Sequence, residues 1–352
     1  MIEQRKGRLA STRASTPRSY AFFGVVVLGG LACVDQAGPP NAVEGTHSDV
    51  IYGTDNRTEI KDVVDPELKG FGAAVAAIGV QIDSCPGGFC TFTGLESFTG
   101  APVSDTLSLP LCSTERFRGQ LRGGGNCTGF LVAPDTFVTA GHCLCETPPC
   151  SCNDSTGKPL SVVFDFQAGA NGQPPSGVAS SEVYKCTGVP QGILASTGED
   201  WAVFKVDRPV AHRTPLIVQY SGSLAHDTAA IYGFPFALPL KMTDGAAVEE
   251  DTDAFKFFTN ADVYKGDSGG PTVDTSTKIV TGVTVTERDS DFAAQSDGNG
   301  GSCAASHVCP TNGGAPCNSG PELTGHSRMP HIAQTAKIPL HVALISAGAG
   351  TF

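Results

Sequence analysis

The sequence predicts an all-β protein built as a sandwich or a barrel. Its 352 residues include 43 glycines and 24 prolines, a composition typical of short strands joined by turns. Strand candidates recur along the chain, and no long helical patterns alternate with them as a parallel α/β sheet would require. At this length the chain can bury a large core, so one large or two smaller domains are expected.

Each expected strand is an apolar or β-branched run bounded by turn signals. Residues 129–133 and 136–140 are predicted to be two strands joined by a turn, because Pro134 and Asp135 separate them. Small apolar residues make up another candidate at 72–82. The further candidates are 161–166, 201–206, 229–233 and 278–286.

The N-terminus predicts export. Basic residues precede an apolar run over 20–32, which glycines interrupt and which is too short for a good membrane span. This pattern is typical of a signal peptide over 1–33. Gly30-Leu31-Ala32-Cys33 resembles a bacterial lipobox, which implies lipidation of Cys33 and attachment to the membrane. An ordinary signal peptide with an incidental cysteine is the alternative. Without Cys33 the thirteen cysteines become twelve, which can all pair in an oxidising compartment.

The charge of the chain argues against nucleic acid as a partner. The whole chain carries −12 and residues 1–33 carry +4, so the remainder carries −16. A body this acidic is not expected to bind phosphates. Residues 34–49 are expected to be a flexible leader or tether, followed by an ordered domain over 50–345.

Ser268 is the candidate nucleophile. It lies in Gly266-Asp267-Ser268-Gly269-Gly270-Pro271, where glycines let the backbone turn tightly and present N–H groups to a developing oxyanion. Serine is a weak nucleophile at its own pKa and needs a neighbouring base. The segment also fits the Gly-x-Ser-x-Gly pattern of esterases. However, the residues after Ser268 look extended and the best histidine context lies upstream, which disfavours an esterase elbow.

His142 is the candidate base, in Thr139-Ala140-Gly141-His142-Cys143. The run from Gly125-Asn126-Cys127-Thr128-Gly129 through His142-Cys143 resembles the trypsin-like serine peptidases. The resemblance implies that His142 is the general base, and that Cys127 and Cys143 form a disulfide that clamps its loop. Imidazole suits this role because its unperturbed pKa lies near neutrality.

Asp200 is implied as the third catalytic residue. Glu199-Asp200-Trp201-Ala202-Val203 resembles the strand that carries the family's catalytic aspartate, which holds the imidazole in the right tautomer. Glu199 and Asp165 are the alternative carboxylates. The order His142, Asp200, Ser268 is the chain order of trypsin-like enzymes.

The resemblance implies a chymotrypsin-like fold of two antiparallel six-stranded β-barrels, with the active site between them. The boundary is expected near 190–215, and cysteine-rich loop insertions are expected, one of them over 288–330. The resemblance also assigns the oxyanion hole to the N–H groups of Gly266 and Ser268 and pairs Asp267 with a positive group. The family's Ile-Val-Gly-Gly activation sequence is absent, which argues against trypsin-style zymogen activation.

No cofactor and no metal are expected. Cys143, Cys145, Cys150 and Cys152 stand beside His142 with a spacing that resembles a zinc cluster. Export favours disulfides instead, because thiols are oxidised outside the cytoplasm.

Asp262 is the candidate for primary specificity. In the family the residue six positions before the serine lies at the base of the specificity pocket, so a carboxylate there implies a preference for Arg or Lys. A structural aspartate is the alternative, because Tyr264 replaces the pocket cysteine of vertebrate trypsins.

A further segment is expected to contact substrate. Val285, Thr286 and Glu287 are expected to pair with an extended substrate through main-chain hydrogen bonds. Segments 50–57 and 232–241 resemble bacterial secreted relatives, including the glutamyl endopeptidase branch. In that branch a histidine after the serine binds the substrate glutamate; Thr284 holds that place here, so glutamyl specificity is not expected.

The predicted function is a serine endopeptidase that acts on protein or peptide substrates through an acyl-enzyme. It is expected to be exported, either secreted or lipid-anchored at a bacterial cell envelope. A non-catalytic binding protein on the same scaffold is the alternative. The presence of His142, Asp200 and Ser268 together favours the enzyme, since binding would not require all three.

Overall fold

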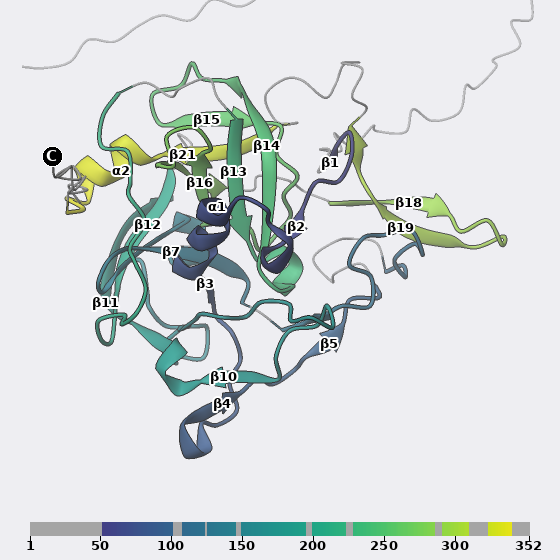
Figure 1. The fold of residues 1–352 in the computed structure, drawn as a ribbon, viewed down its shortest axis with the longest axis horizontal. Helices are drawn as coiled ribbons and strands as arrows, with labels where there is room; N and C mark the ends of the chain where they lie inside the picture. Colours follow the sequence, from purple (N-terminus) through teal and green to yellow (C-terminus); the bar gives the residue numbers. More distant parts are fainter. Residues whose placement is uncertain are drawn as a thin grey trace, which may run out of the picture. The chain divides into compact units, whose positions relative to one another are not determined.

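Two barrels of antiparallel strands form the body of the protein in the computed structural model (Figure 1). The structure describes residues 51–100, 108–123, 125–145, 149–194, 199–222, 228–285, 291–309 and 323–339. The signal peptide expected over 1–33, its Cys33 and the leader expected over 34–49 lie outside these residues.

The first barrel is closed by six strands in the order β11-β12-β8-β7-β3-β9. The strands β7 and β8 are buried along their whole length and are joined at Pro134-Asp135, as expected. The β12–β8 pairing aligns Ala202 with Thr139, which brings the start of β12 beside the end of β8. The bounds are β3 Val75–Ile78, β7 Cys127–Ala133, β8 Thr136–Thr139, β9 Ser161–Val163, β11 Val183–Leu194 and β12 Asp200–Val206.

The second barrel also has six strands, in the order β13-β16-β17-β21-β15-β14, and the pairing of β13 with β14 closes it. A short strand, β2 (Thr58–Glu59), adds to the outer edge of β14. The two six-stranded antiparallel barrels expected from the sequence are therefore confirmed. The bounds are β13 Thr228–Gly233, β14 Lys241–Glu250, β15 Lys256–Thr259, β16 Pro271–Asp274, β17 Val280–Val285 and β21 Thr324–Arg328.

Several strands carry little local signal. The strand β11 contains Gly188 and Pro190, which normally weaken a strand, and its register with β12 shifts between Thr187 and Gln191. This irregularity accommodates a residue that has no N–H for the ladder. The strand β21 is the small and polar run Thr-Gly-His-Ser-Arg, and it lies inside the segment 288–330 that was expected to be an insertion. The C-terminal part of the segment 288–330 thus contains a barrel strand, because β21 pairs with β15 and β17.

The hydrophobic core is continuous from one barrel to the other. Phe130 and Phe137 of the first barrel belong to the same buried cluster as Tyr232 and Phe234 of the second. The helix α2 (Met329–Thr335) adds Ile332 to this cluster. Burial of each large apolar side chain contributes about 1.5–3 kcal/mol, so this shared core holds the two barrels together.

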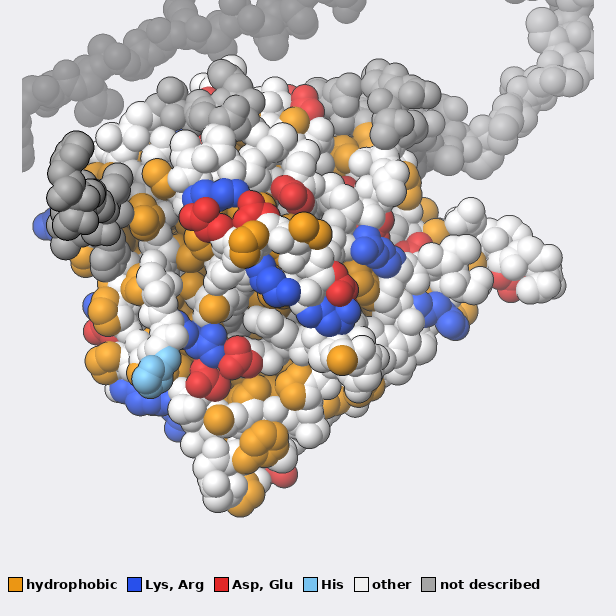
Figure 2. Space-filling model, in the orientation of Figure 1, with side chains coloured by type: hydrophobic (Ala, Val, Ile, Leu, Met, Phe, Trp, Pro, Cys, Tyr) orange, Lys and Arg blue, Asp and Glu red, His pale blue; other side chains and the backbone are white. Residues whose placement is uncertain are grey.

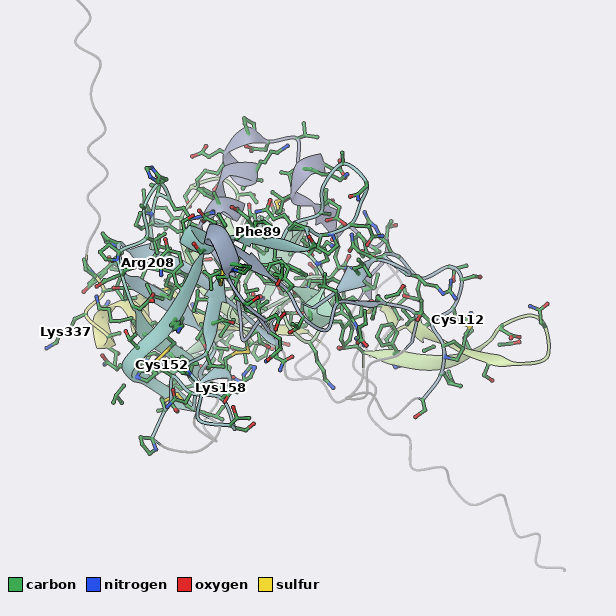
Figure 3. The ribbon with its side chains drawn as sticks, turned by 90° about the horizontal axis from the view of Figure 1, so that it is seen from below. Phe89, Cys112, Cys152, Lys158, Arg208 and Lys337 are labelled. Carbon is green, nitrogen blue, oxygen red and sulfur yellow. A yellow bond between two sulfur atoms is a disulfide. The ribbon has the colours of Figure 1, made fainter. Side chains whose placement is uncertain are left out.

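Smaller elements surround the barrels. A hairpin of β18 and β19 extends from the second barrel, and Cys112 lies beside it (Figure 3). Opposite charges are interspersed among the described side chains on the face drawn in Figure 2. No helix in the described ranges is long and apolar enough to cross a membrane. The remaining strands and the first helix are β1 Ile51–Tyr52, β4 Phe89–Thr91, β5 Glu96–Ser97, β6 Leu121–Arg122, β10 Gly177–Ala179, β18 Phe292–Ser296, β19 Ser302–Ser306, β20 Val308–Cys309 and α1 Pro66–Phe71.

Candidate active site

His142 is held at the end of a first-barrel strand. It lies in a short 3-10 turn, Gly141–Cys143, that follows β8 directly. Cys143 forms the disulfide with Cys127 at the start of β7 that the resemblance implies. A Cβ added to Gly141 would lie 2.8 Å from Asp200 Oδ1, so glycine is what lets the turn approach the carboxylate.

Asp200 is the carboxylate that contacts His142. Its Oδ2 lies 2.7 Å from His142 Nδ1, and its Oδ1 accepts the His142 backbone N–H at 2.8 Å. Asp200 and the adjacent Trp201 are 5% and 4% exposed, so water competes little for this pair. The Ser327 hydroxyl of β21 donates to the Asp200 backbone oxygen at 2.7 Å. Both barrels therefore hold the carboxylate in place.

The two alternative carboxylates have other partners. Glu199 Oε1 lies 2.8 Å from His331 Nε2 in α2. Asp165 Oδ2 accepts a hydrogen bond from Arg213 at 2.8 Å. Of the three candidate carboxylates, it is Asp200 whose side chain contacts the imidazole.

Ser268 lies in a tight turn that leads into β16. Gly266 has a φ of 102°, and a Cβ there would lie 2.4 Å from a backbone oxygen of the second barrel. Thr128 of β7 holds this turn from the first barrel. Its N–H donates to Ser268 O at 2.8 Å and its hydroxyl donates to Gly266 O at 2.7 Å.

The two candidate oxyanion donors are oriented through the carbonyls that precede them. The Phe236 N–H donates to Lys265 O at 2.6 Å. Because the N–H and C=O of a trans peptide point in opposite directions, the Gly266 N–H is directed away from Phe236. Similarly, Asp267 O accepts the Gly270 N–H at 2.9 Å, which directs the Ser268 N–H away from Gly270.

His142, Gly266 and Ser268 line one cleft with a volume of about 1740 Å³. The cleft continues over the first barrel, along residues of 78–85 and 151–161. The structure thus brings the candidate base, the candidate nucleophile and the residues of both candidate oxyanion donors to a common space.

Asp262 is engaged by backbone N–H groups from the N-terminal segment. Its Oδ1 accepts the Tyr52 N–H at 2.7 Å and its Oδ2 accepts the Asn56 N–H at 2.9 Å. The residue is 1% exposed, and burial raises the pKa of its carboxyl to about 6. It is not among the residues that line the cleft. The structure therefore favours the structural alternative for Asp262 over the expected role in a specificity pocket.

The expected substrate-pairing segment is described only in part. Val285 ends β17, is buried and pairs with Gly325 of β21. Thr286 and Glu287 lie outside the described residues.

The histidine of β21 is a buried polar residue that the sequence analysis did not identify. His326 is fully buried, with Nδ1 2.8 Å from Thr272 Oγ1 and Nε2 2.8 Å from Thr259 Oγ1. Thr272 Oγ1 also lies 3.3 Å from Thr284 Oγ1, so hydroxyl groups connect the imidazole to β17. The register that places His326 opposite Thr284 is a long-range pairing, which no local pattern signals.

The cysteines form disulfides, so the zinc-like spacing does not indicate a metal site. The sulfur atoms of Cys127 and Cys143 and a ring nitrogen of His142 lie within 4.8 Å of one another. Both sulfurs are already bonded to each other, and a cysteine binds metal as a thiolate. The bridges among described residues are Cys85–Cys90, Cys112–Cys303, Cys127–Cys143, Cys145–Cys150 and Cys152–Cys186.

Comparison with known proteins identifies the domain. Residues 127–283 match a family described as a trypsin-like peptidase domain. No curated protein sequence matches the chain. Among solved structures, the chain is similar to a Glu endopeptidase in complex with MPD, at 16% identity and a TM-score of 0.44, over 82% of this chain and 100% of that one. It is also similar to an inactive form of the Rv3671c protease, at 16% identity and a TM-score of 0.37, over 78% and 93% of the two chains. A serine-to-alanine mutant of Rv3671c from M. tuberculosis H37Rv gives 17% identity and a TM-score of 0.36, over 78% and 91%. The chain contains a trypsin-like peptidase domain.

Proposed function

We propose that this trypsin-like peptidase domain is a serine endopeptidase that cleaves peptide bonds through an acyl-enzyme. The contact between His142 and Asp200 carries the proposal. An ionised carboxylate only accepts hydrogen bonds, so the Nδ1 atom at 2.7 Å from Asp200 Oδ2 bears the proton. The lone pair is then on Nε2, which is the state that a general base requires.

In the first half of the reaction, Ser268 Oγ attacks the carbonyl carbon of the scissile peptide bond. His142 Nε2 takes the hydroxyl proton, and Asp200 stabilises the imidazolium that forms. The carbonyl oxygen becomes an oxyanion, which accepts hydrogen bonds from the Gly266 and Ser268 N–H groups. His142 then gives its proton to the leaving amine as the C–N bond breaks, which leaves the acyl group on Ser268.

In the second half, a water molecule replaces the leaving amine in the cleft. His142 Nε2 accepts a proton from this water as its oxygen attacks the acyl carbon. The bond between the carbon and Ser268 Oγ then breaks and His142 returns the proton to the serine. The second product leaves with a new carboxyl group, and the enzyme regains its starting state.

We also propose that the enzyme acts outside the cytoplasm, attached through a lipid on Cys33. The basic and apolar pattern of 1–33 supports export, and the disulfides suit an oxidising compartment. Asp262 gives no support to a preference for Arg or Lys, because both of its oxygens accept backbone N–H groups. The proposal therefore includes no basic specificity.

A fluorophosphonate probe tests the proposal, because it reacts with a serine hydroxyl only where a base and an oxyanion hole are assembled. The purified wild-type protein should be labelled, and mass spectrometry should place the adduct on Ser268. The variant Ser268→Ala should lose labelling, while Ser302→Ala, which removes an exposed hairpin serine, should keep it. Equal labelling of wild type and Ser268→Ala, or none of wild type, would leave the binding-protein alternative.

A further inference from the structure

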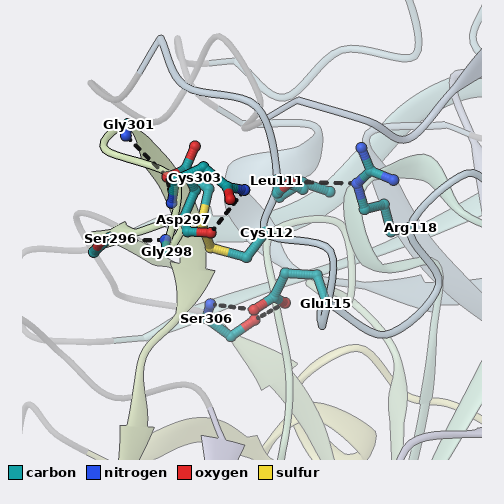
Figure 4. The surroundings of a disulfide bond; sticks show 11 residues. Leu111, Cys112, Glu115, Arg118, Ser296, Asp297, Gly298, Gly301, Cys303 and Ser306 are labelled. Carbon is teal, nitrogen blue, oxygen red and sulfur yellow. Dashed lines mark hydrogen bonds between the residues drawn. A yellow bond between two sulfur atoms is a disulfide. The ribbon is translucent and has the colours of Figure 1, made fainter.

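The loop formed by residues 262–268 carries both candidate oxyanion donors, and Tyr264 anchors its rear side. Tyr264 is 1% exposed, and its N–H donates to Asp267 Oδ2 at 2.8 Å. Its hydroxyl donates to Ser306 Oγ. Ser306 is in turn fixed by Glu115, whose carboxylate accepts the Ser306 N–H at 2.8 Å and its hydroxyl at 2.6 Å (Figure 4). Tyr264 therefore links the 262–268 loop to the β18–β19 hairpin.

The Cys112–Cys303 disulfide ties this hairpin to the rest of the chain (Figure 4). Phe292 of β18 packs against Tyr264, with 5.7 Å between the two ring centroids. Phe236 lies on Tyr264 as well, at 5.2 Å between ring centroids. The rear of the 262–268 loop is thus a small hydrophobic cluster, separate from the main core, that also includes Ile51 of the N-terminal segment.

Arg57 lies against the ring of Tyr264. Its guanidinium carbon is 4.2 Å from the centre of the Tyr264 ring, and the residue is only 4% exposed. The guanidinium is held in this position by Asp55, through bonds of 2.9 Å from Nε and 2.6 Å from Nη2. A buried cation on an aromatic face is stabilised by the ring and by a carboxylate partner, so Arg57 keeps its charge here.

Asp262 connects the same two parts of the chain at a second point. Its carboxylate accepts the N–H groups of Tyr52 and Asn56, which lie on either side of the turn that leads to Arg57. The segment 51–59 is itself fixed at both ends, by pairing of β1 with β20 and of β2 with β14. A rigid segment therefore contacts the first residue of the 262–268 loop and also its tyrosine.

Arg57 also acts on the protonation of Asp267, a buried carboxyl in the same loop. Asp267 is 4% exposed, and burial raises the pKa of its carboxyl to about 7. The Tyr264 N–H and the positive charges of Arg57 and Lys241 favour its ionised form, whereas the charge of Asp291 opposes it. Lys241 also forms an ion pair with Glu59, with 3.1 Å between Nζ and Oε1. The buried cations thus help to keep the Asp267 carboxylate ionised, so that it accepts the Tyr264 N–H within the turn that contains Ser268.

We propose that the N-terminal segment 51–59 positions the 262–268 loop for catalysis, with Arg57 and Asp262 as positioning residues. The stacked guanidinium and the two N–H groups on Asp262 hold the loop from behind. This fixes the peptides whose Gly266 and Ser268 N–H groups stabilise the oxyanion. The positive charge of Arg57 also favours the ionised form of Asp267, the residue that the family resemblance pairs with a positive group. The inference rests on the proposed peptidase function.

The test compares Arg57→Gln with Arg213→Gln as a matched control. Arg213 is also a poorly exposed, ion-paired arginine, but its partners are Asp165 and Glu182 of the first barrel. With a peptide substrate, Arg57→Gln should lower kcat by about 10- to 100-fold and leave KM nearly unchanged, because misplaced donors weaken transition-state binding. Guanidinium ion should restore part of the lost rate in Arg57→Ala. Arg213→Gln should keep the wild-type kcat.

Asp262→Asn separates this role from substrate recognition. It should lower kcat by a similar factor for substrates with Arg, Leu or Glu before the scissile bond. A loss confined to basic substrates would overturn the inference and make Asp262 a specificity residue.

Hydrogen exchange supplies a readout that does not depend on activity. The backbone amides of 262–270 should exchange faster in folded Arg57→Gln than in wild type, and Arg213→Gln should match wild type. If Arg57→Gln does not fold, Arg57→Lys and Asp262→Asn give the same comparison. Wild-type kcat together with wild-type exchange in these variants would overturn the inference. Failure of wild type to label or to hydrolyse peptides would refute the peptidase function instead.

Discussion

Replacing Asp262 with asparagine should change how the free energy of unfolding depends on pH. Burial raises the pKa of this carboxyl from 3.8 to about 6 in the folded protein. Between these two values the folded state binds more protons than the unfolded state, so the unfolding free energy falls as the pH rises. The destabilisation begins above pH 3.8 and is complete above about pH 6. Asparagine does not titrate, and its variant lacks this contribution.

The magnitude follows from the same two pKa values. One pKa unit corresponds to about 1.4 kcal/mol, so the full effect in wild type is about 3 kcal/mol. Of this destabilisation, linkage places about 1 kcal/mol at pH 4.5 and nearly the full amount at pH 7.5. The difference in unfolding free energy between wild type and Asp262→Asn should therefore change by about 2 kcal/mol over this range, in favour of the variant at the higher pH. The variant also loses a hydrogen bond, but that loss is nearly constant with pH and cancels in the comparison.

Urea unfolding curves at pH 4.5 and 7.5, with disulfides intact, measure this difference. Asp244→Asn is a suitable control, because Asp244 is an exposed carboxylate of the same barrel. Two results would contradict the prediction: a difference in unfolding free energy between wild type and Asp262→Asn that stays constant with pH, or one that changes in the opposite direction. Either result would show that burial beside the Tyr52 and Asn56 N–H groups does not raise the pKa of this carboxyl.

Two further predictions concern the catalytic residues and their support. Asp200→Asn should lower kcat by about 10⁴-fold with little change in KM, because the amide favours the wrong tautomer of His142. Steady-state assays with a peptide substrate measure this, and the control variant Glu199→Gln should stay near wild type. Replacing Cys127 and Cys143 together with serine opens a loop with a sequence separation of 16 residues, which should lower the unfolding free energy by about 3 kcal/mol in urea titrations. An Asp200→Asn enzyme of normal kcat, or a double serine variant of unchanged stability, would contradict these assignments.

Short motifs in the sequence were enough to single out the candidate nucleophile Ser268 and the candidate base His142. The glycines around Ser268 and the Gly-His-Cys turn require special local backbone geometry, so their identities are visible in a few consecutive residues. The choice of Asp200 over Glu199 also followed from local pattern, and the contact with His142 agrees with it. The two-barrel fold was expected through the resemblance, although strands such as β11 and β21 carry proline, glycine or polar residues that conceal them.

Only the tertiary structure decided what Asp262, Arg57 and His326 do. The hydrogen-bond partners of Asp262 lie 210 and 206 residues away in the chain, at Tyr52 and Asn56. Arg57 meets Tyr264 across a comparable separation, and His326 meets Thr272 across 54 residues. Local sequence sets backbone turns and strand propensity, because these depend on neighbouring residues. The environment of a buried charge depends instead on which distant segments pack around it, and that is settled when the barrels close.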